Sequence, residues 1–236
     1  MFKKIRIPIL SLMILCGGLI CFFCFKESDP RAQEKSPFKG VTMKLPEPKL
    51  ESQTSVEQAL LKRRSAREYK EDSLSLEQIS QLLWAAQGIT AEWGGRTSPS
   101  AGALYPLEIY LVAGKVKGLK PGLYHYEPEK HSIIQKKDGD LREELTKASL
   151  HQEEILNAPV SIVITAIYAR TMKKYEQRGI RYVHMEVGSA GENIYLQAES
   201  LGLGTVFIGA FEDDEVKKVL GIEEEPLGIM PIGKKI

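Results

Sequence analysis

The feature that most constrains the fold is a run of apolar, largely β-branched residues at positions 159–167. A strand buried on both faces carries such a continuous run, whereas a strand with one wet face alternates apolar and polar residues. The run therefore predicts a central strand of a sheet. The chain can bury the core that such a strand needs, since 43% of its 236 residues are hydrophobic.

The other predicted elements are helices and strands that intermix without strict alternation. Capping-box patterns begin two helices, at Ser55 with Gln58 and at Ser75 with Gln78. The longest helix is predicted at residues 182–201 and is ended by the glycines that follow it. The remaining predictions are strands at 107–113, 122–126, 132–134, 206–208 and 227–232 and helices at 141–148 and 213–220. This mixture predicts an α+β fold rather than a doubly wound parallel sheet.

Charge and cysteine content exclude several classes of protein. The formal net charge is +1, so the chain lacks the basic field that nucleic-acid binding requires. The cysteines are Cys16, Cys21 and Cys24, and the rest of the chain has no thiol for a disulfide, a nucleophile or a zinc site. The four histidines show no metal-ligand spacing. We therefore expect neither a nucleic-acid partner nor a metal.

The first 26 residues predict a transmembrane anchor. Residues 7–25 carry no charge and would span about 28 Å as a helix, close to the roughly 30 Å of a bilayer core. Three cations precede this segment, and Glu27 and Asp29 follow it, which places the rest of the chain on the extracytoplasmic side. A cleaved or lipoprotein signal and a buried helix are the alternatives. Residues 27–54, with four prolines, predict an extended linker, and residues 55–236 the globular domain.

A dense group of cations follows the first predicted helix. Ser65 lies among three arginines, Arg63, Arg64 and Arg67. A guanidinium group can bind a phosphate with two parallel hydrogen bonds, and a serine hydroxyl offers one more donor. A helix end that attracts cations is the alternative explanation. Two further segments accompany this group: Ser-Pro-Ser-Ala-Gly-Ala-Leu-Tyr-Pro at 98–106 and Gly-Lys-Lys at 233–235.

These three segments, in this order, resemble the flavin-dependent nitroreductase family over roughly residues 55–236. The segment at 98–106 is similar to the branch that contains the SagB-type azoline dehydrogenases. The resemblance implies a central, mostly antiparallel sheet flanked by helices, a homodimer, and FMN as cofactor. It implies an oxidoreductase that transfers hydride to or from flavin N5, with a small-molecule or peptide substrate and an unidentified electron donor. A binding protein without redox turnover is the alternative.

The resemblance also implies roles for single residues at the two ends of the cofactor. Those at the phosphate and ribityl end are Arg63, Arg64, Ser65, Lys234 and Lys235. Arg67 would reach the pyrimidine edge and stabilise the reduced flavin. A frayed basic tail is the alternative for the two lysines.

The ring of the flavin is expected to lie between two further segments. The residues implied on one face, contributed by the second subunit, are Pro99, Ser100, Ala101 and Gly102. Ile208 and Gly209 are implied on the N5 side. A surface loop and a strand bulge, respectively, are the alternatives.

Lys174 and Tyr175 are the nearest match to a Lys-Tyr pair that assists proton removal in the SagB-type branch. Either side chain can act as a base when oxidation of a C–H bond sends hydride to N5. The alternative is a solvated basic segment in front of the long helix.

Overall fold

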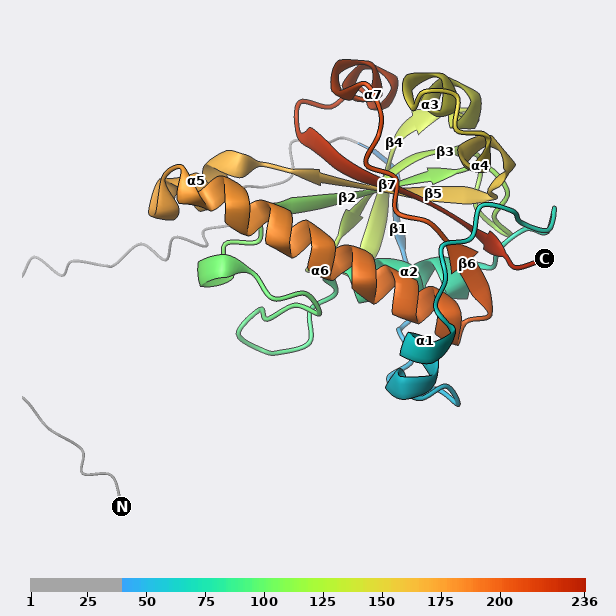
Figure 1. Cartoon of the computed structure of the whole chain (residues 1–236), viewed down its shortest axis with the longest axis horizontal. Helices are drawn as coiled ribbons and strands as arrows, with labels where there is room; N and C mark the ends of the chain where they lie inside the picture. The colour runs from blue at the N-terminus through green and yellow to red at the C-terminus, as the bar shows by residue number, and fades with distance from the viewer. Residues whose placement is uncertain (1–39) are drawn as a thin grey trace, which may run out of the picture. The chain divides into compact units, whose positions relative to one another are not determined.

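The apolar run becomes β5 (Val160–Ala166), an interior strand whose seven residues are all buried. It pairs with β2 (Leu107–Ala113) on one side and with β7 (Glu225–Lys234) on the other. The structure, a computed structural model, describes residues 40–236. In these residues the strands form one seven-stranded sheet in the order β1-β4-β3-β2-β5-β7-β6, in which each neighbouring pair is antiparallel (Figure 1).

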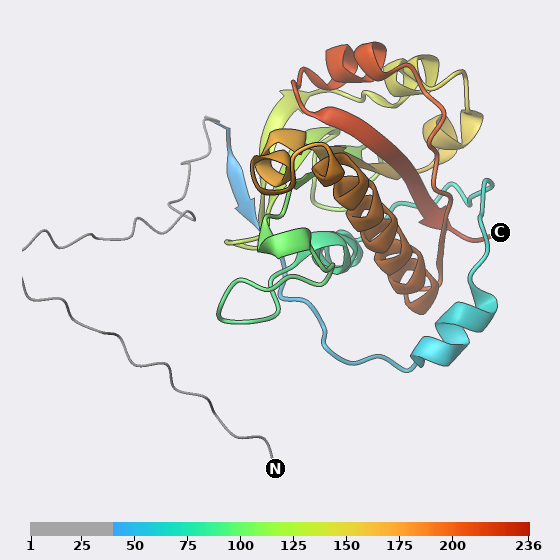
Figure 2. The same cartoon turned by 60° about the vertical axis from the view of Figure 1, so that its left-hand side comes forward.

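Helices cover both faces of this sheet (Figures 1 and 2). The other strands are β1 (Thr42–Lys44), β3 (Gly122–Glu127), β4 (Ser132–Asp138) and β6 (Leu203–Thr205). The helices are α1 (Val56–Lys62), α2 (Leu76–Gln87), α3 (Arg142–Ala148), α4 (Glu153–Asn157), α5 (Tyr168–Tyr175), α6 (Arg178–Ser200) and α7 (Asp213–Leu220), with a short 3₁₀ turn, η1 (Ala101–Ala103). This arrangement confirms the predicted α+β fold with a mostly antiparallel central sheet.

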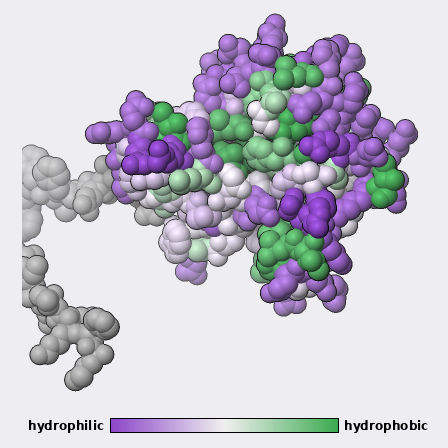
Figure 3. Space-filling view, in the orientation of Figure 1, coloured by the Kyte–Doolittle hydropathy of each residue, from purple (hydrophilic) through white to green (hydrophobic). Residues whose placement is uncertain are grey.

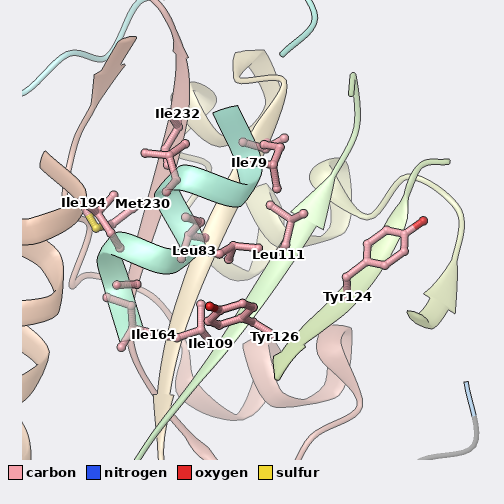
Figure 4. Close-up of a cluster of buried hydrophobic side chains, with 14 of the residues drawn as sticks. Ile79, Leu83, Ile109, Leu111, Tyr124, Tyr126, Ile164, Ile194, Met230 and Ile232 are labelled. Atoms are coloured by element: carbon pink, nitrogen blue, oxygen red, sulfur yellow. The ribbon is translucent and has the colours of Figure 1, made fainter. Parts of the chain in front are cut away.

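The period-two alternation of β5 divides the core into two layers. Ile162 and Ile164 face the cluster under α2 and α6, which also contains Ile194 (Figure 4). Val163 faces the opposite cluster, which includes residues of α3 and α7 such as Leu220. Both faces of the strand are therefore dry, and this explains why its sequence shows no polar alternation.

The long helix α6 starts four residues before the predicted boundary and extends over 23 residues, about 34 Å. Two glycines of this helix have different surroundings. A Cβ atom at Gly191 would lie 2.8 Å from the ring of Phe207, so this glycine admits the ring against the helix. Gly188 faces open space instead. The two glycines of α6 therefore differ, one facing the interior and one exposed.

Pairing along β7 explains where the predicted strand at 206–208 was wrong. The residues that pair are 203–205, opposite residues 232–234 of β7. The helix ends at Ser200, Gly202 adopts φ of +69°, and β6 begins directly after this glycine. Phe207 then donates its backbone N–H to the Tyr195 hydroxyl rather than to a strand. The apolar side chains at 206–208 indicate that these residues are buried, but burial here is not accompanied by a continuous ladder of backbone hydrogen bonds with β7.

The folded part of the chain reaches into the segment predicted as a linker. β1 pairs with β4, and Leu45 is buried directly after it. Gln81 of α2 then accepts a hydrogen bond from the backbone of Lys49 at 2.8 Å. The ordered unit thus begins before Ser55.

The predicted transmembrane anchor requires correction. Residues 1–26, on which it was based, lie outside the described part of the chain. Among residues 40–236, no helix is long and apolar enough to cross a membrane. Residues 40–236 therefore contain no membrane-spanning helix that would support a membrane anchor or an extracytoplasmic location.

The capping box of α2 generates the first prediction. Ser75 Oγ accepts from the Gln78 backbone N–H at 3.3 Å, and the Gln78 side chain accepts from the Ser75 N–H at 2.9 Å. Ser75→Ala should lower the free energy of unfolding by about 0.5–2 kcal/mol, measured by urea denaturation. Ser73→Ala is the control, because Ser73 caps no helix. Equal losses in the two variants would contradict the role of the cap.

Candidate functional site

The cation-rich segment at residues 63–67 lies in extended form beside β6 and the end of β7. Ala66 donates its backbone N–H to the Thr205 carbonyl at 2.8 Å, and Lys70 donates to the Lys234 carbonyl at 3.0 Å. A Cβ at Gly204 would lie 2.7 Å from Cβ of Ala66, so this close approach needs glycine. The structure thus brings together the cationic segment and the C-terminal lysines, two of the segments singled out in the sequence.

Tyr195 of α6 joins this segment to the turn after β6. Its hydroxyl lies 3.0 Å from Ser65 Oγ and accepts the Phe207 N–H at 2.8 Å. The Arg63 guanidinium lies 4.9 Å from the centre of the Tyr195 ring, within the range of a cation–π contact. Arg63 also approaches Glu192 at 3.9 Å. Sequence patterns do not single out Tyr195, because nothing local links it to Ser65, which lies 130 positions away.

The other two arginines of the segment point in different directions. Arg64 turns back on its own backbone, where Nη1 donates to the carbonyls of Leu61 at 3.1 Å and Arg63 at 2.6 Å. Arg67 Nε lies 3.5 Å from Glu154 of α4, and its side chain is 63% exposed. Arg64 is therefore the one predicted phosphate ligand in this segment whose guanidinium is occupied locally.

Each terminal lysine has a carboxylate partner. Lys234 Nζ lies 3.1 Å from Asp72, and Lys235 pairs with Glu199 of α6. The Lys234–Asp72 pair is exposed, and exposed ion pairs contribute little to stability, so an anionic ligand can take over Lys234 at small cost. The Glu199 side chain is only 10% exposed, so its pair with Lys235 is less easily broken. The donor set suits a phosphate group.

The turn after β6 offers accessible backbone. Ile208 is buried and exchanges two backbone hydrogen bonds with Ile229, each 2.9 Å long. Gly209 is exposed, and no atom lies within 4 Å of the place where its Cβ would stand. A flat ring can approach the chain closely at this position.

The loop at residues 98–105 is held in a strained conformation beside α6. Gly102, Ala103 and Tyr105 have φ values of +65°, +54° and +46°. Left-handed residues other than glycine cost about 1–3 kcal/mol each and persist only where neighbours impose them. Here Ser100 Oγ accepts the Tyr105 N–H at 2.9 Å, and the Arg96 guanidinium lies 4.5 Å from the centre of the Tyr105 ring.

The buried end of this loop is fixed to the helices around it. Ser98 donates its hydroxyl to the Ala86 carbonyl at 2.9 Å and accepts from the Asn193 side chain at 3.0 Å. At the other end, Pro99 and Gly102 are exposed, whereas Ser100 and Ala101 are half-buried. The four predicted ring-facing residues thus form an accessible edge on a fixed base.

Lys174 and Tyr175 meet the same loop. A Cβ at Gly102 would lie 2.9 Å from the Tyr175 hydroxyl and 3.0 Å from Lys174 Nζ. The Lys174 ammonium lies 5.4 Å from the Tyr175 ring centre, and that ring packs edge-on against Tyr182. The structure therefore brings the predicted catalytic pair and the predicted ring-facing loop together within one chain.

A charged network on the other face of the sheet holds α5 and the loop together. Arg170 of α5 donates to the Tyr105 carbonyl at 3.1 Å and pairs with Glu108 at 2.6 Å. Glu108 also pairs with His125 at 2.6 Å. Although burial raises it, the pKa of Glu108 is lowered overall by hydrogen bonds and charge from His125 and Arg170. No sequence pattern reveals this network, since its members come from three separate elements.

Glu186 of α6 lies beneath the loop and is only 3% exposed. Burial raises its pKa to about 7, while the Ser100 hydroxyl, the Arg96 charge and the Gln87 amide oppose that rise. The sequence analysis missed this residue because a single glutamate in a helix of mixed polarity is usually solvated.

The two groups of residues occupy opposite sides of α6. Glu186 and Tyr195 are nine positions apart, which at about 100° per residue places them on opposite faces of the helix. Glu186 faces the loop, and Tyr195 faces the cation-rich segment. Within a single chain, α6 therefore separates the loop from the cations.

Comparison with known proteins identifies the family. The model of the nitroreductase family matches residues 60–234. A candidate nitroreductase of Methanocaldococcus jannaschii is 49% identical over 197 residues, which cover 84% of this chain and 99% of that protein. The chain therefore belongs to the nitroreductase family, and it has the predicted nitroreductase-like fold.

Further similarities agree with this fold and with one branch of the family. The crystal structure of a candidate nitroreductase from Ralstonia eutropha superposes with a TM-score of 0.73 and 30% identity, over 83% of this chain and 90% of that one. The microcin B17-processing protein McbC of Escherichia coli is 28% identical over 134 residues, 55% of this chain and 49% of McbC. Such weaker similarity to peptide-processing proteins supports the predicted SagB-like branch.

Burial of Glu186 generates the second prediction. A pKa of 4.5 in the unfolded chain and about 7 in the folded one means that the folded state holds this proton more tightly. Stability is full below pH 4.5 and falls as the pH rises to about 7. This difference of about 2.5 in pKa, at about 1.4 kcal/mol for each pKa unit, amounts to at most roughly 3–4 kcal/mol of stability.

Glu186→Gln removes this titration and should reduce the loss of stability between pH 5 and pH 8, as measured by urea unfolding. Glu143→Gln, at an exposed position of α3, is the control. The pKa of Glu143 is lowered by Lys147, so it stays ionised at both pH values. The same loss in wild type and Glu186→Gln would show that Glu186 does not change its protonation in this range.

Proposed function

We propose that this protein is an FMN-dependent oxidoreductase that transfers hydride to or from N5 of the flavin. Membership of the nitroreductase family supports an oxidoreductase. The main observation in favour of FMN is that Arg63 and Ser65 both contact Tyr195, next to Gly204 and the terminal lysines. This group combines cations, a hydroxyl and close glycine backbone, the donor set that a flavin phosphate and ribityl chain require.

At the phosphate end, Arg63, Ser65 and Lys235 bind the anion. Arg63 is only loosely paired with Glu192, at 3.9 Å, which leaves its guanidinium free to turn toward a ligand. Arg67 lies next along the same extended segment and binds the pyrimidine edge. There its charge stabilises the negative charge that reduction places on N1 and O2.

At the ring, the backbone at Gly209 lies on the N5 side, where open space permits a close approach. The bound flavin supplies a two-electron hydride acceptor or donor at N5. Lys174 and Tyr175 hold or remove the substrate proton on the other side, above Gly102. The exposed edge at Pro99 and Gly102 admits a small molecule or a peptide.

The solved microcin synthetase complex of Escherichia coli, which binds truncated pro-microcin B17, supports a peptide as one class of substrate. It shares the fold, with a TM-score of 0.63 and 21% identity, over 94% of this chain and 85% of that one. NADH, NADPH and other donors are the candidate electron partners. A flavin-binding protein without redox turnover is the rival function, and anaerobic titration with these donors separates the two.

Two chains are needed to complete each site, because α6 separates the loop from the cations within one chain. We infer a homodimer in which the loop of one protomer covers the flavin held by its partner. The exposed stripe of α6, with Met185, Gly188 and Glu192, provides a surface for close helix contact. α1 adds a hydrophobic patch of Val56, Leu60 and Leu61 (Figure 3).

FMN binding by the purified chain is the third prediction. Charge-assisted hydrogen bonds contribute about 1.5–3 kcal/mol each, so Arg63→Ala should weaken FMN binding at least tenfold, measured by quenching of flavin fluorescence. Arg64→Ala is the matched control, because the Arg64 guanidinium is engaged by its own backbone. Equal effects in the two variants would place Arg63 outside the site. A colourless protein that binds no added FMN would refute the proposed cofactor.

The dimer is the fourth prediction, to be measured by sedimentation. Gly188→Arg should convert the dimer to a monomer and still permit folding, because no atom lies within 4 Å of a Cβ at this position. Glu143→Arg on α3, away from the α6 stripe, should leave the dimer intact. A stable monomer that retains full FMN occupancy would contradict a site shared between two chains.

A further inference from the structure

A group of buried polar atoms lies beneath the 98–105 loop, outside the residues that the family resemblance implied. Among the described residues, the carboxyl oxygens of Glu186, Gln87 Nε2 and Arg96 Nε make no hydrogen bond of ordinary length and angle, although Ser100 and Gln87 lie close enough to Glu186 to favour its ionised form. Gln87 and Arg96 are joined by a hydrogen bond of 3.2 Å and both act on the Glu186 carboxyl. Buried polar groups are normally paired, so this cluster requires an explanation.

The neighbours of Glu186 are suited to both of its protonation states. Ser100, Gln87 and Arg96 all present donors, which an ionised carboxylate can accept from. Burial opposes ionisation, and this effect is the larger. The side chain is therefore poised between its two forms near neutral pH, with a pKa of about 7.

Few charges face this carboxyl. Arg96, in the loop after α2, is the charged group that acts on it, and Arg96 is also bound to Glu129 at 3.0 Å. α2 contributes the neutral Gln87 and the 98–105 loop the neutral Ser100. A new negative charge on the far side of the loop would thus act on Glu186 with little compensation.

We propose that Glu186 is the redox-linked proton acceptor of this active site and takes up a proton from solvent when the flavin is reduced. The inference rests on the proposed function, because Ser100, whose hydroxyl acts on the Glu186 carboxyl, is one of the residues proposed to face the flavin. Reduction adds negative charge to the flavin, and a nearby like charge favours the neutral form of a carboxyl group. Proton uptake at Glu186 offsets that charge.

Two electrons from the donor and one proton from solvent convert the bound flavin to its reduced anion. One further proton passes from solvent to the Glu186 carboxylate, and no other bond is made or broken there. Because burial raises the pKa of Glu186 to about 7 in the chain without a ligand, we expect uptake of the additional proton above about pH 7.

The experiment is a series of flavin midpoint potentials of the FMN-loaded full chain between pH 6 and pH 9, measured with an electrode and redox mediators. Above pH 7, the midpoint potential of wild type should fall more steeply with pH than that of Glu186→Gln. The extra slope should correspond to the uptake of one additional proton for every two electrons. Below pH 7 the two slopes should agree. Glu143→Gln should follow wild type throughout. Parallel lines for wild type and Glu186→Gln would overturn the inference.

A second measurement needs no variant and guards against misfolding of Glu186→Gln. The reduced-minus-oxidised infrared difference spectrum of wild type at pH 8 should gain a protonated carboxyl C=O band that shifts in D₂O. Absence of this band would overturn the inference while the bound flavin still titrates. Failure to bind FMN is visible beforehand as a colourless protein, and it would overturn the proposed function together with this inference.

Discussion

The insertion of the Phe207 ring between two glycines sets the position of most of the candidate site. Gly191 of α6 and Gly228 of β7 both face this ring, and a side chain at either position would collide with it. The contact fixes the distance between the long helix and the sheet. Because the backbone of Phe207 also donates to Tyr195, the same contact orients the tyrosine that holds Ser65. The cation-rich segment is therefore positioned from the core outward.

Local signals in the sequence predicted the elements that depend on local physics. The capping box at Ser75 and the continuous apolar run of β5 were both correct, because the first needs only neighbours in sequence and the second only burial. The strand at 206–208 was misplaced, since apolar side chains report burial but not pairing with β7. α5 was not predicted, because most of its residues are exposed or basic and its contacts, such as those of Arg170 with Glu108 and of Tyr168 with His184, join residues distant in sequence.

The candidate site divides in the same way. The cationic segment, the loop and the Lys174–Tyr175 pair were recognisable from motifs and family resemblance. What no motif showed is how these parts meet: the contact of Gly102 with Tyr175, the orientation of Arg64 toward its own backbone, and the burial of Glu186. These depend on contacts between residues distant in sequence, and they decide which charged groups are available to a ligand.

The left-handed residues at Ala103 and Tyr105 have a consequence for local stability. Side chains such as Arg96 and Arg170 hold this loop, rather than a ladder of backbone hydrogen bonds. Segments of this kind open locally at a free energy far below that of global unfolding. Release of the loop would relieve backbone strain while the sheet beneath it stays intact. We therefore expect the backbone amides of the loop at residues 98–105 to exchange with solvent faster than those of the sheet beneath it.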